Sequence, residues 1–245
     1  MRLRFLYRAL KARFRDQKQE ISALLQAIHP GDTVVDIGAN KGSYLWWLSK
    51  AVGVGRVVAF EPQKQLADYL AEACRACKMK NVIIEPLAVS ERSGETVLNI
   101  PGETASPEAS IESVITLHEK CRQEKVKMVS LDDYFADEKS RISAIKMDVE
   151  GHELSVFRGA IKVLLKHSPL LVFECENRHQ RGGGAVTDVL GYLADIGYQG
   201  FFVKDNLLLP LKEFNPDVHQ RQEGSRYWDS KDYCNNFVMS KDSTQ

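Results

Sequence analysis

The stretch Val34–Tyr44, which reads VVDIGANKGSY, predicts a buried strand, a tight glycine turn and the beginning of a helix. Its first residues are apolar without alternation, as in a strand that a parallel sheet covers on both faces. Gly38 lets the backbone turn sharply and approach a ligand closely, because glycine has no Cβ atom. A helix that begins near Gly42 offers unpaired N–H groups at its N-terminus. We therefore expect a ligand at the end of this strand.

The spacing of the two glycines distinguishes between classes of ligand. A dinucleotide-binding turn carries a second glycine so that the backbone can reach the pyrophosphate. Residues 36–42 instead follow the pattern D-x-G-x-x-x-G. S-adenosylmethionine has no pyrophosphate, and the pattern resembles the first motif of Rossmann-like methyltransferases. A glycine turn that only connects a strand to a helix is the alternative interpretation.

The next predicted strand, Arg56–Phe60, runs directly into Glu61, 19 residues after Gly42. A carboxylate at this position lies beside the glycine turn and can accept hydrogen bonds from both ribose hydroxyls of an adenosine. The third predicted strand, Val82–Glu85, is followed by small residues that leave room for an adenine ring near the backbone of Val89. The three strands together predict an adenosine site.

A second chemical centre follows the predicted strand Ile142–Met147. Asp148, Glu150 and His152 come directly after this strand, and Glu174 ends the next one. Open α/β sheets bind their ligands at this edge. A hydroxyl acceptor is a poor nucleophile and needs a base, so these four residues are the candidate catalytic residues. We favour a carboxylate as the base, with His152 as the alternative.

The same residues allow other roles. Carboxylates at neighbouring strand ends can also hold Mg²⁺, which would orient and activate a hydroxyl. Glu150 can instead stabilise the first turn of the following helix through the helix dipole, and His152 can be an ordinary surface residue. The predicted helix after this centre runs from Leu154 to Lys166.

The composition limits the class of protein. The 245 residues include 33 Lys and Arg and 33 Asp and Glu, so the net charge does not point to a nucleic-acid partner. Five cysteines without framework spacing suit a reducing compartment. The sequence contains no apolar run of the roughly 18 residues that span a bilayer and no pattern of a secretory signal. We expect a cytoplasmic protein; the sequence does not predict its oligomeric state.

Residues 1–20 predict a basic amphipathic helix. The apolar residues at helical spacing are Leu3, Leu6, Leu10 and Phe14, among seven Lys and Arg residues. We expect this helix to pack beside the domain or to form a solvated arm. Contact with a membrane surface or an anionic glycan is the alternative. The sequence His29-Pro30-Gly31 ends the helical region, so we divide the chain into an extension, 1–29, and a single domain, 30–245.

These motifs together resemble the FkbM-type methyltransferases, a branch of the class I S-adenosylmethionine-dependent enzymes. The resemblance covers about residues 31–205 and is most specific in the block KMDVEG at residues 146–151. It implies an α/β, Rossmann-like class I methyltransferase fold: a seven-stranded, mostly parallel sheet with the last strand antiparallel and helices on both faces. It also implies methyl transfer, usually to an oxygen, with hydroxyls of sugars, glycans, glycolipids or natural products as acceptors.

The resemblance also implies which residues contact the cofactor. Contacts to S-adenosylmethionine carry over to Asp36, Gly38, Asn40, Gly42, Glu61, Ser90 and Asp148. Two other functions stay open: a nicotinamide-dependent oxidoreductase, which the missing second glycine argues against, and a cofactor-binding module without catalytic activity. The polar stretch Pro101–Ser113 is typical of a lid or a disordered loop, and the stretch 205–233 is irregular. We expect both stretches to influence the choice of acceptor.

Overall fold

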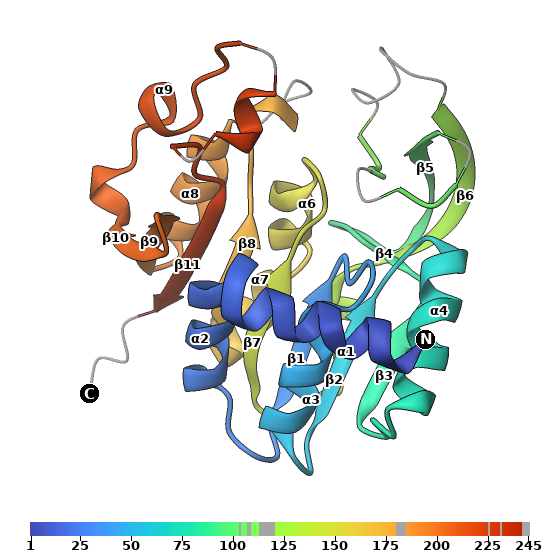
Figure 1. Cartoon of the computed structure of the whole chain (residues 1–245). Helices are drawn as coiled ribbons and strands as arrows, with labels where there is room; N and C mark the ends of the chain where they lie inside the picture. The colour runs from blue at the N-terminus through green and yellow to red at the C-terminus, as the bar shows by residue number, and fades with distance from the viewer. Residues whose placement is uncertain are drawn as a thin grey trace.

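A computed structural model describes residues 1–102, 104–106, 109–112, 121–179, 185–224, 226–230 and 232–241. Its centre is a sheet whose strands follow the order β10-β9-β11-β8-β7-β1-β2-β3 (Figure 1). The strands are β1 (Thr33–Ile37), β2 (Arg56–Phe60), β3 (Val82–Glu85), β7 (Ile142–Met147), β8 (Leu170–Glu174), β9 (Tyr198–Lys204), β10 (Leu207–Pro210) and β11 (Asn236–Lys241). The chain order reverses between β1 and β7, where open α/β sheets form a crevice for ligands.

This sheet has eight strands in the described residues, one more than the seven that we expected. β11 is antiparallel to both of its neighbours, β8 and β9. The additional strand is β10, which pairs with β9 in a hairpin. Asp205 and Asn206 connect these two strands with φ angles of 51° and 58°, the left-handed pair that a two-residue hairpin turn requires. Because the turn contains no glycine, the sequence pattern predicted an irregular stretch here and missed the strand.

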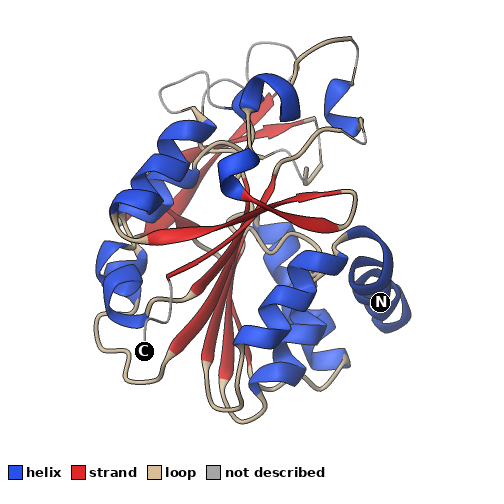
Figure 2. Cartoon of the chain, turned by 90° about the vertical axis from the view of Figure 1, so that its left-hand side faces the viewer, coloured by secondary structure: helices blue, strands red, loops and turns tan. Residues whose placement is uncertain are grey.

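Helices cover both faces of the sheet, as predicted (Figure 2). One face carries α1 (Arg2–Lys11), α2 (Lys18–Ala27), α3 (Leu45–Val52) and α4 (Lys64–Ala76). The other face carries α5 (Leu131–Tyr134), α6 (Glu153–Arg158), α7 (Ile161–His167) and α8 (Val186–Asp195). Side chains alternate along a strand, so Val34 packs in the first core and Val35 in the second. This burial on both sides explains the unbroken apolar run in β1.

The predicted helix Leu154–Lys166 consists of two helices, α6 and α7, which meet at Gly159. A Cβ atom on Gly159 would lie 2.2 Å from Ser90 O, so only glycine allows this close approach of the two backbones. The carboxylate of Asp132 then accepts hydrogen bonds from two backbone N–H groups in the first turn of α7. The break therefore places Ser90 directly against the helical layer.

A smaller sheet lies beside the main one, on the side of β3 and α4 (Figure 1). Its strands are β4 (Ala88–Val89), β6 (Cys121–Val129) and β5 (Gly94–Pro101), in that spatial order. β5 and β6 are antiparallel, with Thr96 opposite Val126 and Ile100 opposite Arg122. Because β4 joins this sheet, the segment that contains Val89 is held in a fixed position next to the end of β3.

The N-terminal region differs from the single helix that we expected. α1 continues into a π-helical turn at Ala12–Asp16, after which α2 begins. Phe5 of α1 reaches the core, whereas Leu3, Leu10 and Phe14 of the predicted apolar face are exposed. The division of the chain after residue 29 stays a prediction. None of the described helices has both the length and the apolar character needed to cross a bilayer.

Candidate active site

A cavity lies at the carboxyl ends of β1, β2 and β7. Of the predicted site residues, those that line the cavity are Gly38, Asn40, Glu61, Val89, Asp148 and His152. Those outside the described lining are Asp36, Gly42, Ser90, Glu150 and Glu174. The first group can contact a ligand bound in this cavity.

Glu61 is buried at the end of β2, with 2% of its surface exposed. Its Oε2 accepts a hydrogen bond from the N–H of Asn40 at 2.8 Å, and its Oε1 accepts one from the N–H of Gln63 at 2.9 Å. Burial raises the pKa of Glu61 to about 7, and the two backbone donors oppose this shift. Each oxygen keeps a further lone pair, so hydroxyl donors from a ligand in the cavity would stabilise the charged carboxylate.

Gly38 and Asp148 form one structural unit. Asp148 N donates to Ile37 O at 3.0 Å, which extends the pairing of β1 and β7 beyond the strand ends. A Cβ atom on Gly38 would lie 1.8 Å from Asp148 O, and the φ of Gly38 is 71°. Both facts require glycine at this position. The glycine turn therefore positions Asp148 at the edge of the cavity, where 34% of its side chain is exposed.

Beneath this unit, Lys146 connects two of the predicted acidic residues. Its Nζ lies 3.5 Å from Asp36 Oδ1 and 3.9 Å from Asp148 Oδ2, and it donates to Gly38 O at 3.2 Å. Burial alone would lower the pKa of Lys146, but the surrounding carboxylates outweigh it and raise the pKa. Burial raises the pKa of Asp36, and Lys146 opposes that shift. Asp36 is thus the buried counter-ion of the lysine beneath the glycine turn.

Gly42 meets α1 and α4 instead of the cavity. Its φ is 75°, and a Cβ atom there would lie 2.8 Å from Leu70 Cδ2 and 2.8 Å from Phe5 Cε2. The helix expected near Gly42 begins at Leu45. Glycine is therefore required here for the packing of the loop against two helices.

We expect Gly42→Ala to lower the free energy of unfolding by about 1–3 kcal/mol, because the added methyl group must displace Phe5 and Leu70 and alanine is strained at positive φ. Denaturant unfolding measures this change. The matched control is Gly191→Ala on the exposed face of α8, where a Cβ atom would meet nothing within 4 Å. That variant should be as stable as the wild type or more stable by up to about 1 kcal/mol. Equal stability of the two variants would contradict the packing role of Gly42.

His152 connects the cavity wall to two other segments. Its Nε2 lies 2.9 Å from Ser90 Oγ, and its Nδ1 lies 2.7 Å from Glu112 Oε1. When Nδ1 donates to the carboxylate, Nε2 accepts from the serine hydroxyl. Both ring nitrogens are therefore engaged, and only 8% of the residue is exposed. In this state the geometry favours a positioning role for His152 over proton transfer from an acceptor.

The described part of the polar stretch Pro101–Ser113 also forms cavity wall; positions 103, 107, 108 and 113 lie outside the described residues. The backbone of Ser106 makes two hydrogen bonds with the side chain of Gln63, at 2.8 and 2.9 Å. Ser110 Oγ donates to Glu150 O at 2.7 Å. Ser110 and its two neighbours line the cavity. These contacts hold the described part of the stretch at the cavity.

The acidic residues at the ends of β7 and β8 influence one another electrostatically. The parallel register of these strands places Asp148 level with Glu174. Burial raises the pKa of Glu174 and of Glu150 well above the ordinary range, and the negative charge of Asp148 adds to both shifts. Both carboxyl groups therefore keep their protons to a higher pH than an ordinary glutamate. Asp148 is the carboxylate of this group that lines the cavity.

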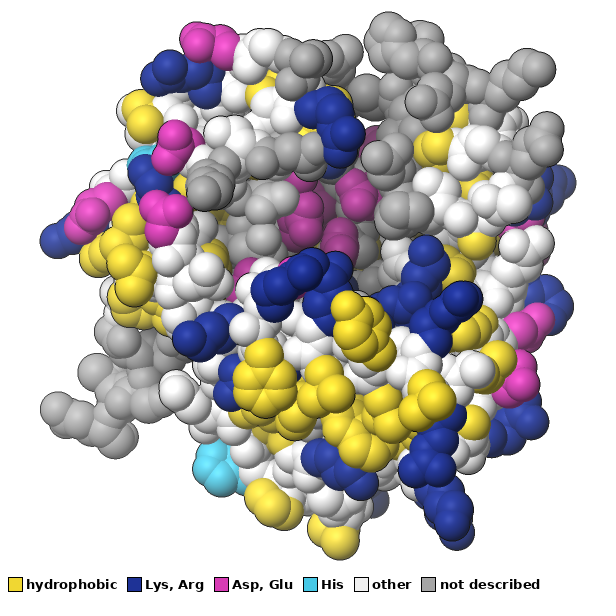
Figure 3. All heavy atoms as spheres, viewed as in Figure 1, with side chains coloured by type: hydrophobic (Ala, Val, Ile, Leu, Met, Phe, Trp, Pro, Cys, Tyr) yellow, Lys and Arg dark blue, Asp and Glu magenta, His cyan; other side chains and the backbone are white. Residues whose placement is uncertain are grey.

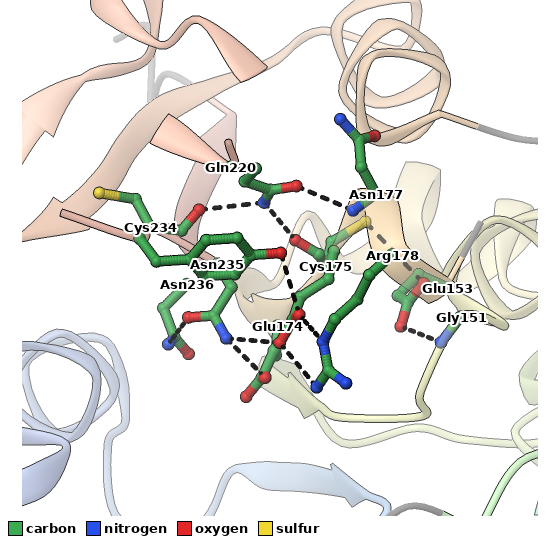
Figure 4. Close-up of polar contacts among 12 residues, drawn as sticks. Gly151, Glu153, Glu174, Cys175, Asn177, Arg178, Gln220, Cys234, Asn235 and Asn236 are labelled. Atoms are coloured by element: carbon green, nitrogen blue, oxygen red, sulfur yellow. Dashed lines mark hydrogen bonds and ion pairs between the residues drawn. The ribbon is translucent and has the colours of Figure 1, made fainter. Parts of the chain in front are cut away.

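A side-chain network fixes the end of β8 (Figure 4). Asn235 Nδ2 donates to Glu174 Oε1 at 2.7 Å and to Glu176 Oε1 at 2.8 Å. Tyr233 and Arg178 both donate to Glu176 Oε2. Burial alone would raise the pKa of Glu176, but Arg178 and the other donors outweigh it and lower the pKa. Asn235, in the segment before β11, thus orients both Glu174 and its neighbour Glu176.

The arrangement can be compared with known families. A model of the family described as "Methyltransferase FkbM domain" matches residues 36–199, which include the glycine turn and the ends of β2, β7 and β8. The chain belongs to the FkbM methyltransferase family. The resemblance inferred from the motifs is therefore confirmed. No curated protein shows significant sequence similarity to the chain.

Solved structures share the fold of this FkbM methyltransferase chain. Methyltransferase FkbM from Methylobacillus flagellatus KT is 17% identical with a TM-score of 0.53; the match covers 96% of this chain and 53% of that one. This chain thus spans about half the length of the Methylobacillus protein. An O-methyltransferase from Bacillus cereus in complex with SAH is 12% identical with a TM-score of 0.53, and the match covers 97% and 88% of the two chains. At these identities the similarity shows the fold alone.

The acidic residues at the ends of β7 and β8 do not form the Mg²⁺ site that the sequence allowed. In the described part of the chain, no three His, Cys, Asp or Glu side chains gather as metal ligands. Glu174 and Glu176 already accept hydrogen bonds from Asn235. We therefore derive no step that involves a metal.

Lys146 and Glu112 contact predicted site residues but were not themselves predicted. The signal for Lys146 is a single cation inside the apolar strand β7, since a buried lysine needs acidic partners. Glu112 had no such signal, because its contact with His152 joins two segments that are distant in the sequence. Sequence periodicity cannot predict a contact of this kind.

Proposed function

We propose that the chain is an S-adenosylmethionine-dependent O-methyltransferase that acts on a hydroxyl of a sugar, glycan, glycolipid or natural product. The observation that carries this proposal is that Glu61 and Asp148 line the same cavity. Glu61 offers acceptor oxygens to the ribose of a methyl donor, and Asp148 offers a carboxylate to the proton of an acceptor. The family membership supports methyl transfer as the reaction.

The cavity fits an adenosine moiety. Burial raises the pKa of Glu61 to about 7 although two backbone N–H groups already donate to it, and two ribose hydroxyls would add further donors. Val89 and the preceding alanine leave an apolar surface for a planar ring. When bound, S-adenosylmethionine supplies an electrophilic methyl group. The residues that would hold it are Gly38, Asn40, Glu61 and Val89.

Asp148 would accept the proton of an acceptor hydroxyl bound in the cavity. Lys146, 3.9 Å from Asp148 Oδ2, holds the carboxylate by charge attraction. The backbone contact of Asp148 with Gly38 fixes its distance from the cofactor turn. These residues would align the reactants and accept one proton. Transfer of a methyl group from a sulfonium requires no further chemistry from the protein.

The acceptor is more specifically a neutral hydroxyl compound. Figure 3 shows Asp and Glu side chains gathered in the hollow at the centre of the molecule. Asp148, Glu150, Glu174 and Glu176 influence one another electrostatically. The negative charges that remain in this group would repel a phosphorylated or carboxylated acceptor, whereas a polyol would find hydrogen-bond partners.

The test measures SAH release from S-adenosylmethionine in the presence of a neutral glycan extract, with and without EDTA. We expect release that depends on the extract and persists in EDTA. Calorimetry with S-adenosylmethionine and with NAD accompanies it. Binding of the methyl donor without release in any extract would favour a non-catalytic binding module. Binding of NAD alone would overturn the proposal.

A further inference from the structure

The outward face of α1 carries apolar side chains that are exposed to solvent. Leu3, Tyr7, Leu10 and Phe14 are 84%, 66%, 47% and 68% exposed. At about 100° per residue, the first three lie within roughly 60° of one another on the helix, and Phe14 follows in the π-helical turn. The buried Phe5 lies on the opposite side. We call these four side chains the α1 patch.

The patch is held in this orientation by contacts on the inner side of the helix. Trp47 Nε1 donates to Ala9 O at 2.8 Å. Arg8 Nη1 donates to Lys41 O and to Tyr69 Oη, both at 3.2 Å. Single exposed apolar residues are normal on a protein surface, but a contiguous patch on an anchored helix is typical of an interaction site.

Positive charge surrounds the patch. Residues 2–18 carry seven cations, Arg2, Arg4, Arg8, Lys11, Arg13, Arg15 and Lys18, of which Arg8 is turned toward the inner side of α1. Asp16 is paired with Lys11 and Arg15 at 3.0 and 2.7 Å, and Glu20 is buried. Figure 3 shows Lys and Arg side chains around the hydrophobic surface on the face that carries α1. Because the whole chain has no net charge, this excess is local.

We propose that α1 and the π-helical turn after it dock on the surface of an anionic lipid bilayer. Leucine and aromatic side chains on one face of a helix, with Lys and Arg beside them, are the features of helices that lie in the lipid interface. The apolar side chains enter the boundary of the acyl chains, and the cations meet anionic headgroups. The proposal is independent of the acceptor that the active site uses.

The charge of the patch decides between possible occupants. A second copy of the chain would bring two strongly basic helices together, which like-charge repulsion opposes. A nucleic acid would satisfy the cations but would leave the leucines in water. An anionic bilayer offers acyl chains to the apolar side chains and anionic headgroups to the cations, so we infer that it is the partner of the α1 patch.

The test is cosedimentation with vesicles of phosphatidylcholine, with and without phosphatidylserine. The wild-type chain should bind the vesicles with phosphatidylserine about tenfold more tightly or better, and added salt should weaken this binding. The double variant Leu3→Ser/Leu10→Ser should bind about tenfold less tightly or worse. The double variant Arg2→Gln/Arg4→Gln should also lose about tenfold, because each charge near the surface contributes separately.

The matched control is Val54→Ser/Leu207→Ser, which removes two side chains that are 93% and 60% exposed and lie outside α1. It should bind vesicles like the wild type. Equal unfolding temperatures of all variants verify that each one is folded. The proposal fails if the wild type does not bind, or if it binds both vesicles equally and the arginine variant is unchanged. A wild-type chain that does not bind vesicles but self-associates in sedimentation analysis would point to a second copy as the occupant. In that case Leu3→Ser/Leu10→Ser should abolish the self-association.

Discussion

Replacement of Asp148 by Asn should lower kcat for methyl transfer by a factor of about 10²–10⁴, the contribution typical of a general base. Asparagine has the shape of the aspartate side chain but cannot take the proton of the acceptor. The affinity for S-adenosylmethionine should change little, because Glu61 and the glycine turn form the cofactor side of the cavity. SAH formation at saturating substrates measures kcat, and calorimetry measures the affinity. Unchanged turnover would remove Asp148 from the mechanism.

The neighbouring carboxyls provide the control for this experiment. Burial and the charge of Asp148 raise the pKa of Glu150 and of Glu174 well above the ordinary range. A glutamine resembles a protonated glutamate, so Glu150→Gln and Glu174→Gln should each lower kcat much less than Asp148→Asn. A loss in Glu174→Gln as large as that in Asp148→Asn would indicate that Glu174 is the base.

Replacement of Glu61 by Gln should raise the Kd for S-adenosylmethionine by a factor on the order of 10–100. Hydrogen bonds to a charged group contribute roughly 1.5–3 kcal/mol each, and glutamine offers the ribose only one acceptor oxygen. Glutamine also places an NH₂ group against one of the two backbone N–H donors, from Asn40 or Gln63. Calorimetric titration measures the effect. A Kd equal to that of the wild type would exclude Glu61 from cofactor binding.

The same pair of proteins should differ in pH dependence. The pKa of Glu61 is about 7 in the free protein, and cofactor binding favours its ionised form. The affinity of the wild type should therefore fall as the pH decreases below 7, approaching about tenfold per pH unit. The Glu61→Gln variant should lack this dependence. Titrations between about pH 5.5 and 8.5 cover the transition of a group with this pKa, and parallel curves for the two proteins would contradict the assignment.

Protonation of Glu61 also affects folding. Its folded pKa of about 7 lies above the ordinary value of 4.5, so the folded state binds the proton more tightly than the unfolded state. This stabilisation is complete below pH 4.5 and is lost as the pH rises toward 7. The free energy of unfolding of the wild type should therefore fall more between pH 4.5 and 7 than that of the Glu61→Gln variant, which has no group of this kind at position 61.

Local patterns were sufficient to predict the elements that form the cofactor side. The apolar run before Gly38 indicated β1 because both faces of that strand are buried. The position of Glu61 followed from the length of one strand–helix–strand unit. β10 was missed because Asp205 and Asn206 make a hairpin turn without glycine. The N-terminal helix was predicted, but its apolar residues were identified only in part: Phe5 is buried in the core, whereas Leu3 and Leu10 are exposed.

The acidic side of the site was predictable only in part. Asp148 and Glu174 end buried strands, which is a local feature of the sequence. The pairings of His152 with Glu112 and of Gln63 with Ser106 depend on loops without periodicity. The role of Asp36 likewise depends on Lys146, more than a hundred positions later in the chain. Contacts of this kind are set by the tertiary arrangement, which no short pattern contains.

The contact of Phe5 with Gly42 links the dynamics of the two segments. A phenyl ring beneath a loop supports it only while its own helix is formed, so fraying of α1 removes both Phe5 and the bond from Arg8 to Lys41 O. The amide protons of the cofactor loop should then exchange with solvent through the same opening events as those of α1, as expected for one cooperative unit. The glycine turn should therefore lose part of its order when the first turns of the chain unfold.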